Sequence, residues 1–397
     1  MHDHVFTLIN GRVYSSGAFP SWSWLRYLEC FSSVTVVARV RQLDAAPKEI
    51  KIDLSECDGV NFIFLPSVSN LKGLVSHGGE SGKELQEIVQ QHDAVVARLS
   101  SELGLLAVSY AKKLEKRLAV ELVDCPWDSY WNYGSWLARL YAPLVTYRVR
   151  RAVAKADAVL YVTERFLQRR YPHGKNSATV ACSNVNIESV DDSVLEQRIQ
   201  RISRRKDVIS HAPIIGQVAS LTGKFKGLQV MLDVMPTLVS LFPGIKYKVL
   251  GAGDPSEWIE KAKALGVSDN VEFSGTRPSG QPVMEWLDDL DIYIHPSLKE
   301  GLPRGVIEAM SRGCPVIASS VAGTPELLPS KYMVEPGSRE DLLEKIQSVI
   351  SNPSLFSVMA TENFERAKSF SAPKLKAKRS QFWRNFAGQV NENSISG

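Results

Sequence analysis

The sequence lacks the features that define several protein classes. Its five cysteines are scattered and odd in number, and none forms a C-x-x-C pair, which argues against a disulfide framework or a zinc site and fits a reducing cytosol. The sequence contains no run of about 18 apolar residues, the length that spans a bilayer. The start at Met1 has neither the basic segment nor the apolar core of a signal peptide. Basic residues outnumber acidic ones only 47 to 43, so nucleic-acid binding is not indicated. We therefore expect a cytosolic protein.

The chain is long enough for more than one domain. At roughly 150 residues per domain, 397 residues predict two or three. Short apolar runs alternate with helical patterns, which favours α/β layers around parallel sheets. The polar stretch between about 190 and 212 interrupts this pattern. We place an N-terminal domain at 1–200, a C-terminal domain at 201–373, and a terminal helix and tail at 374–397.

The second half has the more regular pattern. Apolar strands are expected at 214–218, 247–250, 271–273, 292–294 and 315–318, each bounded by glycine or proline and separated by room for a crossover helix. This pattern predicts a doubly wound sheet, in which ligands bind beyond the carboxyl ends of the strands. The terminal segment is expected to form an amphipathic helix that docks on the globule, with an apolar stripe formed by Leu375, Phe382, Trp383 and Phe386.

The segment from Glu300 to Gly313, which follows a predicted strand, contains residues suited to bind an anion and a sugar. Pro303 suits the first position of a helix of about ten residues, and Gly313 suits the residue after its end. The amides around Gly301 and Leu302 would then form an anion site at the helix start. Two carboxylates, Glu300 before the helix and Glu308 within it, could hold sugar hydroxyls, although an amphipathic helix with two solvated glutamates has the same spacing.

Two other loops follow predicted strands in the same half. The first carries Lys224 and Lys226, whose ammonium groups could neutralise a diphosphate. In the second, Thr324 suits a helix N-cap. All three loops would meet in one crevice of a doubly wound sheet, while ordinary helix capping would explain each loop taken alone.

These segments together resemble a known family. Residues 300–326, EGLPRGVIEAMSRGCPVIASSVAGTPE, are similar to the signature of glycosyltransferase family 4. Its members are retaining enzymes of the GT-B fold, which has two Rossmann-like domains facing across a cleft. The resemblance is strong over roughly residues 213–345. It implies the same fold here, with the C-terminal helix packing back on the N-terminal domain.

The resemblance also implies roles for individual residues. Glu308 would bind the ribose of the nucleotide, Glu300 would touch the donor sugar, and Lys226 would sit on the diphosphate. The amides near Gly301, Leu302 and Pro303, and the loop at Thr324, would complete the donor site. The chain departs from the family at Ser220, where an arginine is usual, and Lys224 is the candidate substitute. No metal and no cofactor would be required.

The N-terminal half should hold the acceptor, a glycan or a lipid-linked sugar. Candidate residues are Gly17 in a loop, Arg98 after a strand, and Asp128 in an aromatic-rich segment. A simple turn, a helix cap and core packing, respectively, would also explain them. The basic stretches 112–117 and 165–170 either meet anionic lipid on the inner membrane face or form solvated helix faces.

The expected function is therefore the transfer of a hexose-type sugar from a nucleotide-diphosphate donor, UDP rather than GDP, in cell-surface polysaccharide biosynthesis. The pair Asp289 and Asp291 matches a D-x-D metal motif, yet Asp291 opens a strand, so we expect no metal there. Two alternatives stay open: a catalytically silent scaffold of the same fold, which the serine at 220 suggests, and a nucleotide-sugar epimerase.

Overall fold

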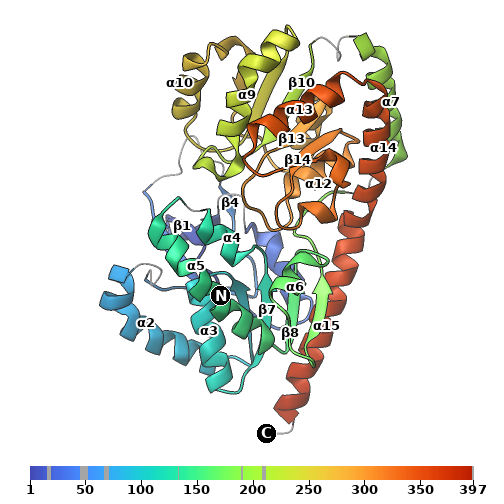
Figure 1. Cartoon of the computed structure of the whole chain (residues 1–397). Coiled ribbons are helices and arrows are strands. Elements are labelled where there is room, and N and C mark those ends of the chain that lie inside the picture. Colours follow the sequence, from blue (N-terminus) through green and yellow to red (C-terminus); the bar gives the residue numbers. More distant parts are fainter. Residues whose placement is uncertain are drawn as a thin grey trace. The chain divides into compact units, whose positions relative to one another are not determined.

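The computed structural model describes residues 1–15, 19–44, 52–66, 71–132, 134–188, 191–207 and 212–395. The chain divides into two compact units (Figure 1). Unit 1 contains residues 1–182 and 376–397, and unit 2 contains residues 183–375. The division thus falls before helix α7 (Asp192–Arg204), and not at residue 200, because α7 packs on unit 2. The side chain of Arg198 on α7 donates to the carbonyls of Leu290 (2.6 Å) and Leu287 (3.0 Å).

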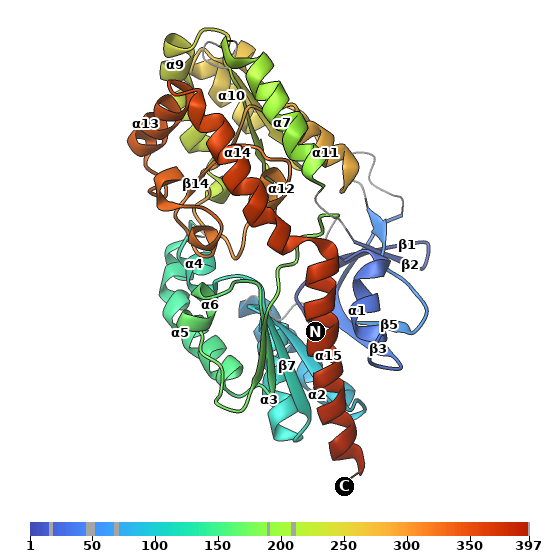
Figure 2. The ribbon, with the colours of Figure 1, turned by 90° about the vertical axis from the view of Figure 1, so that its right-hand side faces the viewer.

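Unit 2 is a doubly wound domain, as the sequence predicts. Its six-stranded parallel sheet has the order β12-β11-β10-β13-β14-β15. Helices α9, α10 and α13 pack together as one group, and α7, α11, α12 and α14 as another (Figure 2). The strands are β10 (Ile214–Val218), β11 (Lys246–Leu250), β12 (Val271–Phe273), β13 (Ile292–His295), β14 (Val316–Ser319) and β15 (Met333–Val334). The other helices are α9 (Leu228–Leu241), α10 (Ser256–Ala264), α11 (Gln281–Asp288), α12 (Arg304–Ser311), α13 (Arg339–Ile350) and α14 (Ser354–Ala367).

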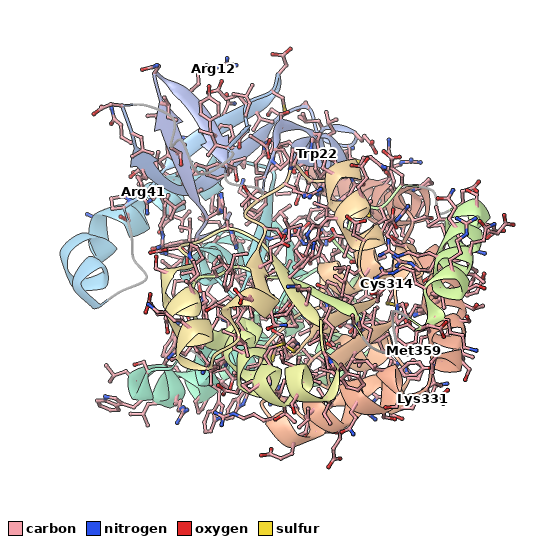
Figure 3. The ribbon with its side chains drawn as sticks, turned by 90° about the horizontal axis from the view of Figure 1, so that it is seen from above. Arg12, Trp22, Arg41, Cys314, Lys331 and Met359 are labelled. Carbon is pink, nitrogen blue, oxygen red and sulfur yellow. The ribbon has the colours of Figure 1, made fainter. Side chains whose placement is uncertain are left out.

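The core of unit 2 consists of aliphatic and aromatic side chains from strands and helices. Cys314 and Met359 are fully buried, whereas Lys331 lies at the rim with its ammonium on Glu362 (Figure 3). Since Cys314 is buried, its thiol packs as a small apolar group, and burial raises its pKa to about 11.

Unit 1 contains two sheets, with the strand orders β4-β2-β1-β3-β5 and β6-β7-β8-β9. The second sheet is parallel. The strands are β1 (Val5–Ile9), β2 (Arg12–Ser15), β3 (Val34–Gln42), β4 (Asp53–Leu54), β5 (Val60–Phe64), β6 (Ala94–Leu99), β7 (Arg117–Leu122), β8 (Ala158–Tyr161) and β9 (Ala178–Ala181). The helices are α1 (Leu25–Leu28), α2 (Leu71–Gln90), α3 (Glu102–Lys113), α4 (Pro126–Trp131), α5 (Trp136–Ala154) and α6 (Phe166–Arg170).

The terminal helix α15 (Ala372–Ile395) contributes its residues from 376 onward to unit 1. Trp383 packs edge-on against Tyr27 with ring centroids 5.0 Å apart, and Phe386 packs against Phe31 at 6.2 Å. Both α15 side chains are completely buried. The prediction that the C-terminal helix packs back on the N-terminal domain is confirmed.

Candidate donor site

Three loops of unit 2 meet because the strands before them are neighbours in the sheet. Strands β10, β13 and β14 are adjacent and parallel, so their carboxyl ends lie at one edge. The amide of Leu298 donates to Phe225 O (2.8 Å), which joins the first two loops. The amide of Gly323 donates to Gly301 O (2.9 Å), which joins the second to the third. The loops that the sequence places in one crevice therefore form one surface.

A charged cluster lies where the first two loops touch. The Lys226 ammonium donates to Glu300 Oε1 at 2.5 Å, and His295 Nε2 lies 2.8 Å from the same oxygen. Glu300 is only 10% exposed. Burial opposes its charged form, but the Lys226 charge and the hydrogen bonds from Lys226 and His295 outweigh burial and hold the Glu300 pKa well below its usual range. Lys226 and Glu300, predicted from separate segments, are thus in direct contact.

Backbone packing fixes the position of Lys226. Gly227 follows it with φ +75°, and a Cβ there would lie 1.9 Å from the Pro296 carbonyl oxygen. Only glycine permits this approach of the two loops. Inside the sheet, the Tyr247 hydroxyl donates to the buried Gln217 (2.6 Å), which in turn donates to Lys226 O (2.7 Å).

Helix α12 begins one residue later than expected. Pro303 is its N-cap and not its first residue, and the helix has eight residues (Arg304–Ser311) and not about ten. No side chain of the described residues caps this end, so the amides of the first turn are open to an anion. At the other end, Gly313 (φ +60°) follows the C-cap, and its amide donates to Met310 O (2.9 Å). The predicted role of Gly313 is confirmed.

Glu308 is the unpaired carboxylate of the site. It lies half-buried on α12, and no other described residue donates a hydrogen bond to its carboxylate. Burial raises its pKa above the ordinary value, and the nearby charge of Arg304 offsets only part of this effect. A carboxylate kept in place without a partner is suited to accept hydrogen bonds from a ligand's hydroxyl groups.

The raised pKa predicts that Glu308 destabilises the free protein at neutral pH. Glu308 has a lower pKa in the unfolded state than in the folded state. Between these two pKa values the folded state binds more protons than the unfolded state, so the free energy of unfolding falls as pH rises through this window. We expect Glu308→Gln to have a higher Tm than the wild type at neutral pH. The difference should vanish below the ordinary glutamate pKa of about 4.3. Thermal unfolding across this pH range measures it, and an equal Tm at neutral pH would contradict it.

The other predicted donor-site residues differ in their surroundings. Ser220 is exposed, and its hydroxyl accepts from the Thr222 amide. Lys224 is also exposed and lies 3.5 Å from Glu257, outside the Lys226–Glu300 cluster. Thr324 does not act as an N-cap, because it is the first residue of a 3₁₀ turn (Thr324–Glu326). Its hydroxyl is buried without a hydrogen-bond partner among the described residues.

Sequence reasoning missed two residues near the cluster. His295 ends β13 and is 2% exposed, and its Nδ1 has no partner in the described part of the chain. Lys299 directs its ammonium to 4.7 Å from the Phe225 ring, and Lys226 lies 5.6 Å from the same ring. His295 is the last residue of a buried strand and Lys299 immediately precedes Glu300, so their position at the carboxyl end of β13 was the signal.

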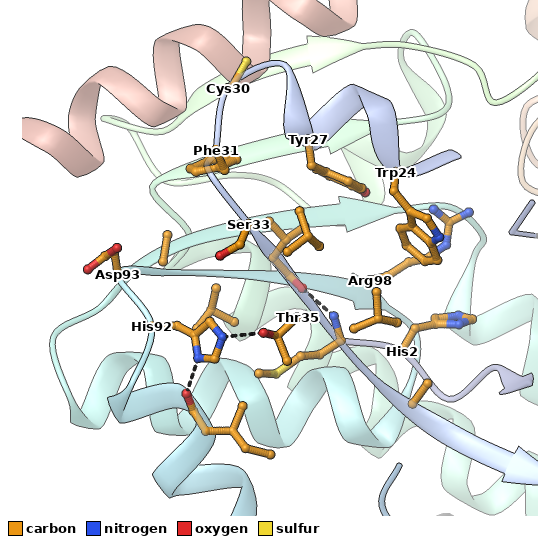
Figure 4. Close-up of a pocket in the computed structure, with 18 of the residues that line it drawn as sticks. His2, Trp24, Tyr27, Cys30, Phe31, Ser33, Thr35, His92, Asp93 and Arg98 are labelled. Carbon is orange, nitrogen blue, oxygen red and sulfur yellow. Dashed lines mark hydrogen bonds between the residues drawn. The ribbon is translucent and has the colours of Figure 1, made fainter. Parts of the chain in front are cut away.

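The acceptor-side candidates lie apart from these loops in sequence. Arg98 donates to the buried Glu121 at 2.6 Å, which also accepts from the Tyr27 hydroxyl (2.8 Å). Arg98 also lines a pocket of about 490 Å³ within unit 1 (Figure 4). Asp128 pairs with Arg170 at 3.1 Å. Gly17 lies outside the described residues.

The D-x-D pair has structural partners. Asp291 is buried, accepts from the Ile214 amide (2.8 Å), and pairs with Arg205 (2.9 Å). Burial nevertheless raises the Asp291 pKa. Asp289 is 70% exposed. Among the described residues, no three His, Cys, Asp or Glu side chains are grouped to hold a metal.

The basic stretches are partly neutralised. Lys112 and Arg117 both lie near Asp157, at 3.4 and 3.5 Å. In the second stretch, Arg170 is paired with Asp128. No helix in the described ranges is both long and apolar enough to cross a membrane.

Comparison with known proteins identifies the class of this fold. Sucrose-phosphate synthase from Thermosynechococcus elongatus superposes with a TM-score of 0.68 at 16% identity, covering 98% of this chain and 100% of that one. Anabaena HepE in complex with UDP-glucose superposes with a TM-score of 0.58 at 16% identity, with complete coverage of both chains. The chain has the GT-B fold.

Sequence relatives identify the domain. Residues 212–352 match the profile of Glycosyl transferases group 1. Protein CapJ of Staphylococcus aureus is 26% identical over 392 residues, 99% of this chain and 96% of CapJ. The putative colanic acid biosynthesis glycosyltransferase WcaL of Escherichia coli is 29% identical over 185 residues, which is 44% of this chain and 42% of WcaL. The chain is therefore a glycosyltransferase with a group 1 domain in unit 2.

Proposed function

We propose that this chain is a retaining, metal-independent hexosyltransferase that uses a UDP-sugar donor and a glycan or lipid-linked acceptor. The observation that carries the proposal is the contact of Lys226 with Glu300 beside the uncapped start of α12. A cation, open amides and a carboxylate are the groups that a sugar attached to a diphosphate requires. The half-buried Glu308 on the same helix supplies an acceptor for ribose hydroxyls.

The reaction follows from the charge that develops. The bond between the anomeric carbon and the diphosphate oxygen breaks, and the diphosphate leaves with its electron pair. Lys226 and the first-turn amides of α12 stabilise this charge without a metal. The acceptor hydroxyl attacks the face that the diphosphate leaves, and its proton passes to a diphosphate oxygen. Because the acceptor attacks the anomeric carbon directly, no enzymic nucleophile is needed. Glu300 holds the sugar hydroxyls during this step.

The relatives support a role in cell-surface polysaccharide biosynthesis. WcaL is described as a putative colanic acid biosynthesis glycosyltransferase. AmsK of Erwinia amylovora is an amylovoran biosynthesis glycosyltransferase and is 36% identical over 126 residues, 30% of each chain. HepE was crystallised with UDP-glucose, which favours UDP in the donor.

Thermal-shift screening with UDP, GDP, ADP and their common sugars tests the donor. A ligand at about 100 times its Kd adds about 2.7 kcal/mol to the native state, so a UDP-sugar should raise the Tm by several degrees. Glu308→Ala should abolish the shift, because it removes the acceptor for the ribose hydroxyls. Asp289→Ala is the control and should retain it. Equal shifts in both variants would contradict the assignment of Glu308.

Lys299 is the candidate for a second cation of the donor site. Lys299 shares the Phe225 ring with Lys226, whereas Lys224 lies beside Glu257. Lys299→Met should therefore lower kcat about tenfold or more through weaker charge stabilisation. Lys224→Met should change it less than about twofold, because an exposed pair contributes little. Steady-state kinetics compare the two, and a larger loss for Lys224→Met would contradict this ranking.

The same kinetic assay separates transfer from the two alternative functions. Release of UDP, including slow hydrolysis of the donor, supports a transferase. An epimerase would yield an altered UDP-sugar without an acceptor. Persistent inactivity with a range of donors and acceptors would favour a silent scaffold and contradict the proposal.

A further inference from the structure

Helix α5 of unit 1 exposes a row of large apolar side chains. Leu137, Leu140, Leu144 and Tyr147 follow one another at intervals of three or four residues, which places them on one helix face. Their exposed fractions are 59, 68, 53 and 56%. Trp136, at the first position of the helix, is 69% exposed. The opposite side of α5 is buried in unit 1 through residues such as Val145 and Val149.

The row continues onto helix α4. Trp131 is 43% exposed and stacks on Trp127 with ring centroids 5.1 Å apart. The Arg139 guanidinium on α5 donates to the Trp131 carbonyl (3.3 Å), which ties the two helices together. A concentration of exposed rings and leucines of this kind marks an interaction surface. We define the α5 face by its apolar members Trp131, Trp136, Leu137, Leu140, Leu144 and Tyr147.

The segment of the chain that carries the α5 face has charged side chains of one sign only. Residues 131–155 contain five arginines and lysines and no aspartate or glutamate. One of the five, Arg148, pairs with Glu102 at 2.8 Å. Arg139, Arg150, Arg151 and Lys155 are exposed. Arg151 also donates to the Tyr147 hydroxyl (2.9 Å), so its charge lies directly beside the apolar row.

We propose that the α5 face docks on an anionic lipid surface. Leucine and tryptophan side chains enter the headgroup region of a bilayer, and flanking arginines bind the phosphates. Helix α5 would lie in the plane of the interface, since the exposed Pro143 and its arginines exclude a crossing helix. A second copy of this chain fits less well, because a symmetric contact would bring the arginines of both copies together.

Vesicle cosedimentation of the full chain tests this proposal. We expect binding to vesicles of equimolar phosphatidylglycerol and phosphatidylcholine, and little binding to phosphatidylcholine alone. Binding should fall in about 1 M NaCl, where the screening length is about 3 Å. Leu140→Gln/Leu144→Gln should weaken partitioning about tenfold or more, and Arg150→Ala/Arg151→Ala about fivefold for each charge. All four side chains are exposed, and Arg150 gives up only a surface hydrogen bond to the Arg170 carbonyl (2.7 Å), so the variants should fold.

Matched controls come from exposed residues elsewhere in the chain. Ile259→Gln/Val358→Gln removes apolar side chains of 46 and 45% exposure, and Lys263→Ala/Lys374→Ala removes exposed charges. Both double variants should bind anionic vesicles as the wild type does. Brominated lipids should quench the tryptophan fluorescence, and Trp136→Phe should reduce that quenching.

Three results would overturn the proposal. The first is no binding to anionic vesicles at low salt, and the second is equal binding of the α5-face and control variants. The third is a concentration-dependent dimer, seen by light scattering, that the leucine variant alone abolishes. Lipid docking does not require donor chemistry, so Glu308→Ala should bind vesicles normally. Failure of the lipid-docking proposal and failure of the proposed function are therefore distinguishable.

Discussion

Replacing Lys226 with methionine should lower kcat by about 10²- to 10³-fold, the loss expected when one preorganised charge contact is removed from a leaving group. Methionine keeps much of the apolar length of the side chain and removes only the ammonium. The free protein holds this ammonium against Glu300 at 2.5 Å, so the cation is already positioned before a donor binds. Donor binding should weaken much less than kcat, because Glu308 and the α12 amides remain. Kinetics with a saturating UDP-sugar measure the effect.

The control for this variant is Lys224→Met, two residues earlier on the same loop. Lys224 is exposed and lies beside Glu257, so its loss should leave kcat within about twofold of the wild type. Lys226→Met also leaves Glu300 with His295 as its remaining close partner, which should raise the pKa of Glu300 from its lowered value. Circular dichroism and Tm would show whether the variant is folded. A folded Lys226→Met enzyme with normal kcat would contradict the role of Lys226.

The arrangement of the donor site was accessible from the sequence because its strands are clearly marked. The strands at 214–218 and 271–273 were predicted with the bounds that the structure has. A parallel sheet brings the ends of such strands to one edge, so topology alone places Lys226 near Glu300. The end of the helix at Gly313 was equally predictable, since a left-handed residue after the C-cap favours glycine.

Side-chain pairings that the strand order does not determine were not accessible in this way. The buried Glu121 on β7 interrupts an apolar strand, and it is tolerated because Arg98 and Tyr27 bind its two oxygens. Neither partner is close to Glu121 in sequence. The partner of Lys224 likewise depends on where α10 places Glu257. Side-chain pairing across elements depends on packing, and spacing along the chain does not determine it.

Gly227→Ala should strongly destabilise unit 2. The added Cβ would lie 1.9 Å from the Pro296 carbonyl oxygen, and φ at this position is +75°. Overpacking against backbone costs about 1–3 kcal/mol, and the left-handed conformation costs a non-glycine residue about 1–2 kcal/mol. We expect a loss of about 2–5 kcal/mol in the free energy of unfolding of unit 2. Denaturant unfolding at equilibrium measures it.

Gly275→Ala separates the two contributions to this loss. Gly275 also has a positive φ, +67°, but an added Cβ meets nothing within 4 Å, so only the backbone contribution of about 1–2 kcal/mol should appear. The difference between the variants then measures how tightly the Lys226 loop is held against the Pro296 loop. Because the same contact positions the ammonium beside Glu300, folded Gly227→Ala protein should also lose kcat, whereas Gly275→Ala should not. Equal stability of the two variants would mean that the loops can separate freely, and Lys226 would then not be preorganised.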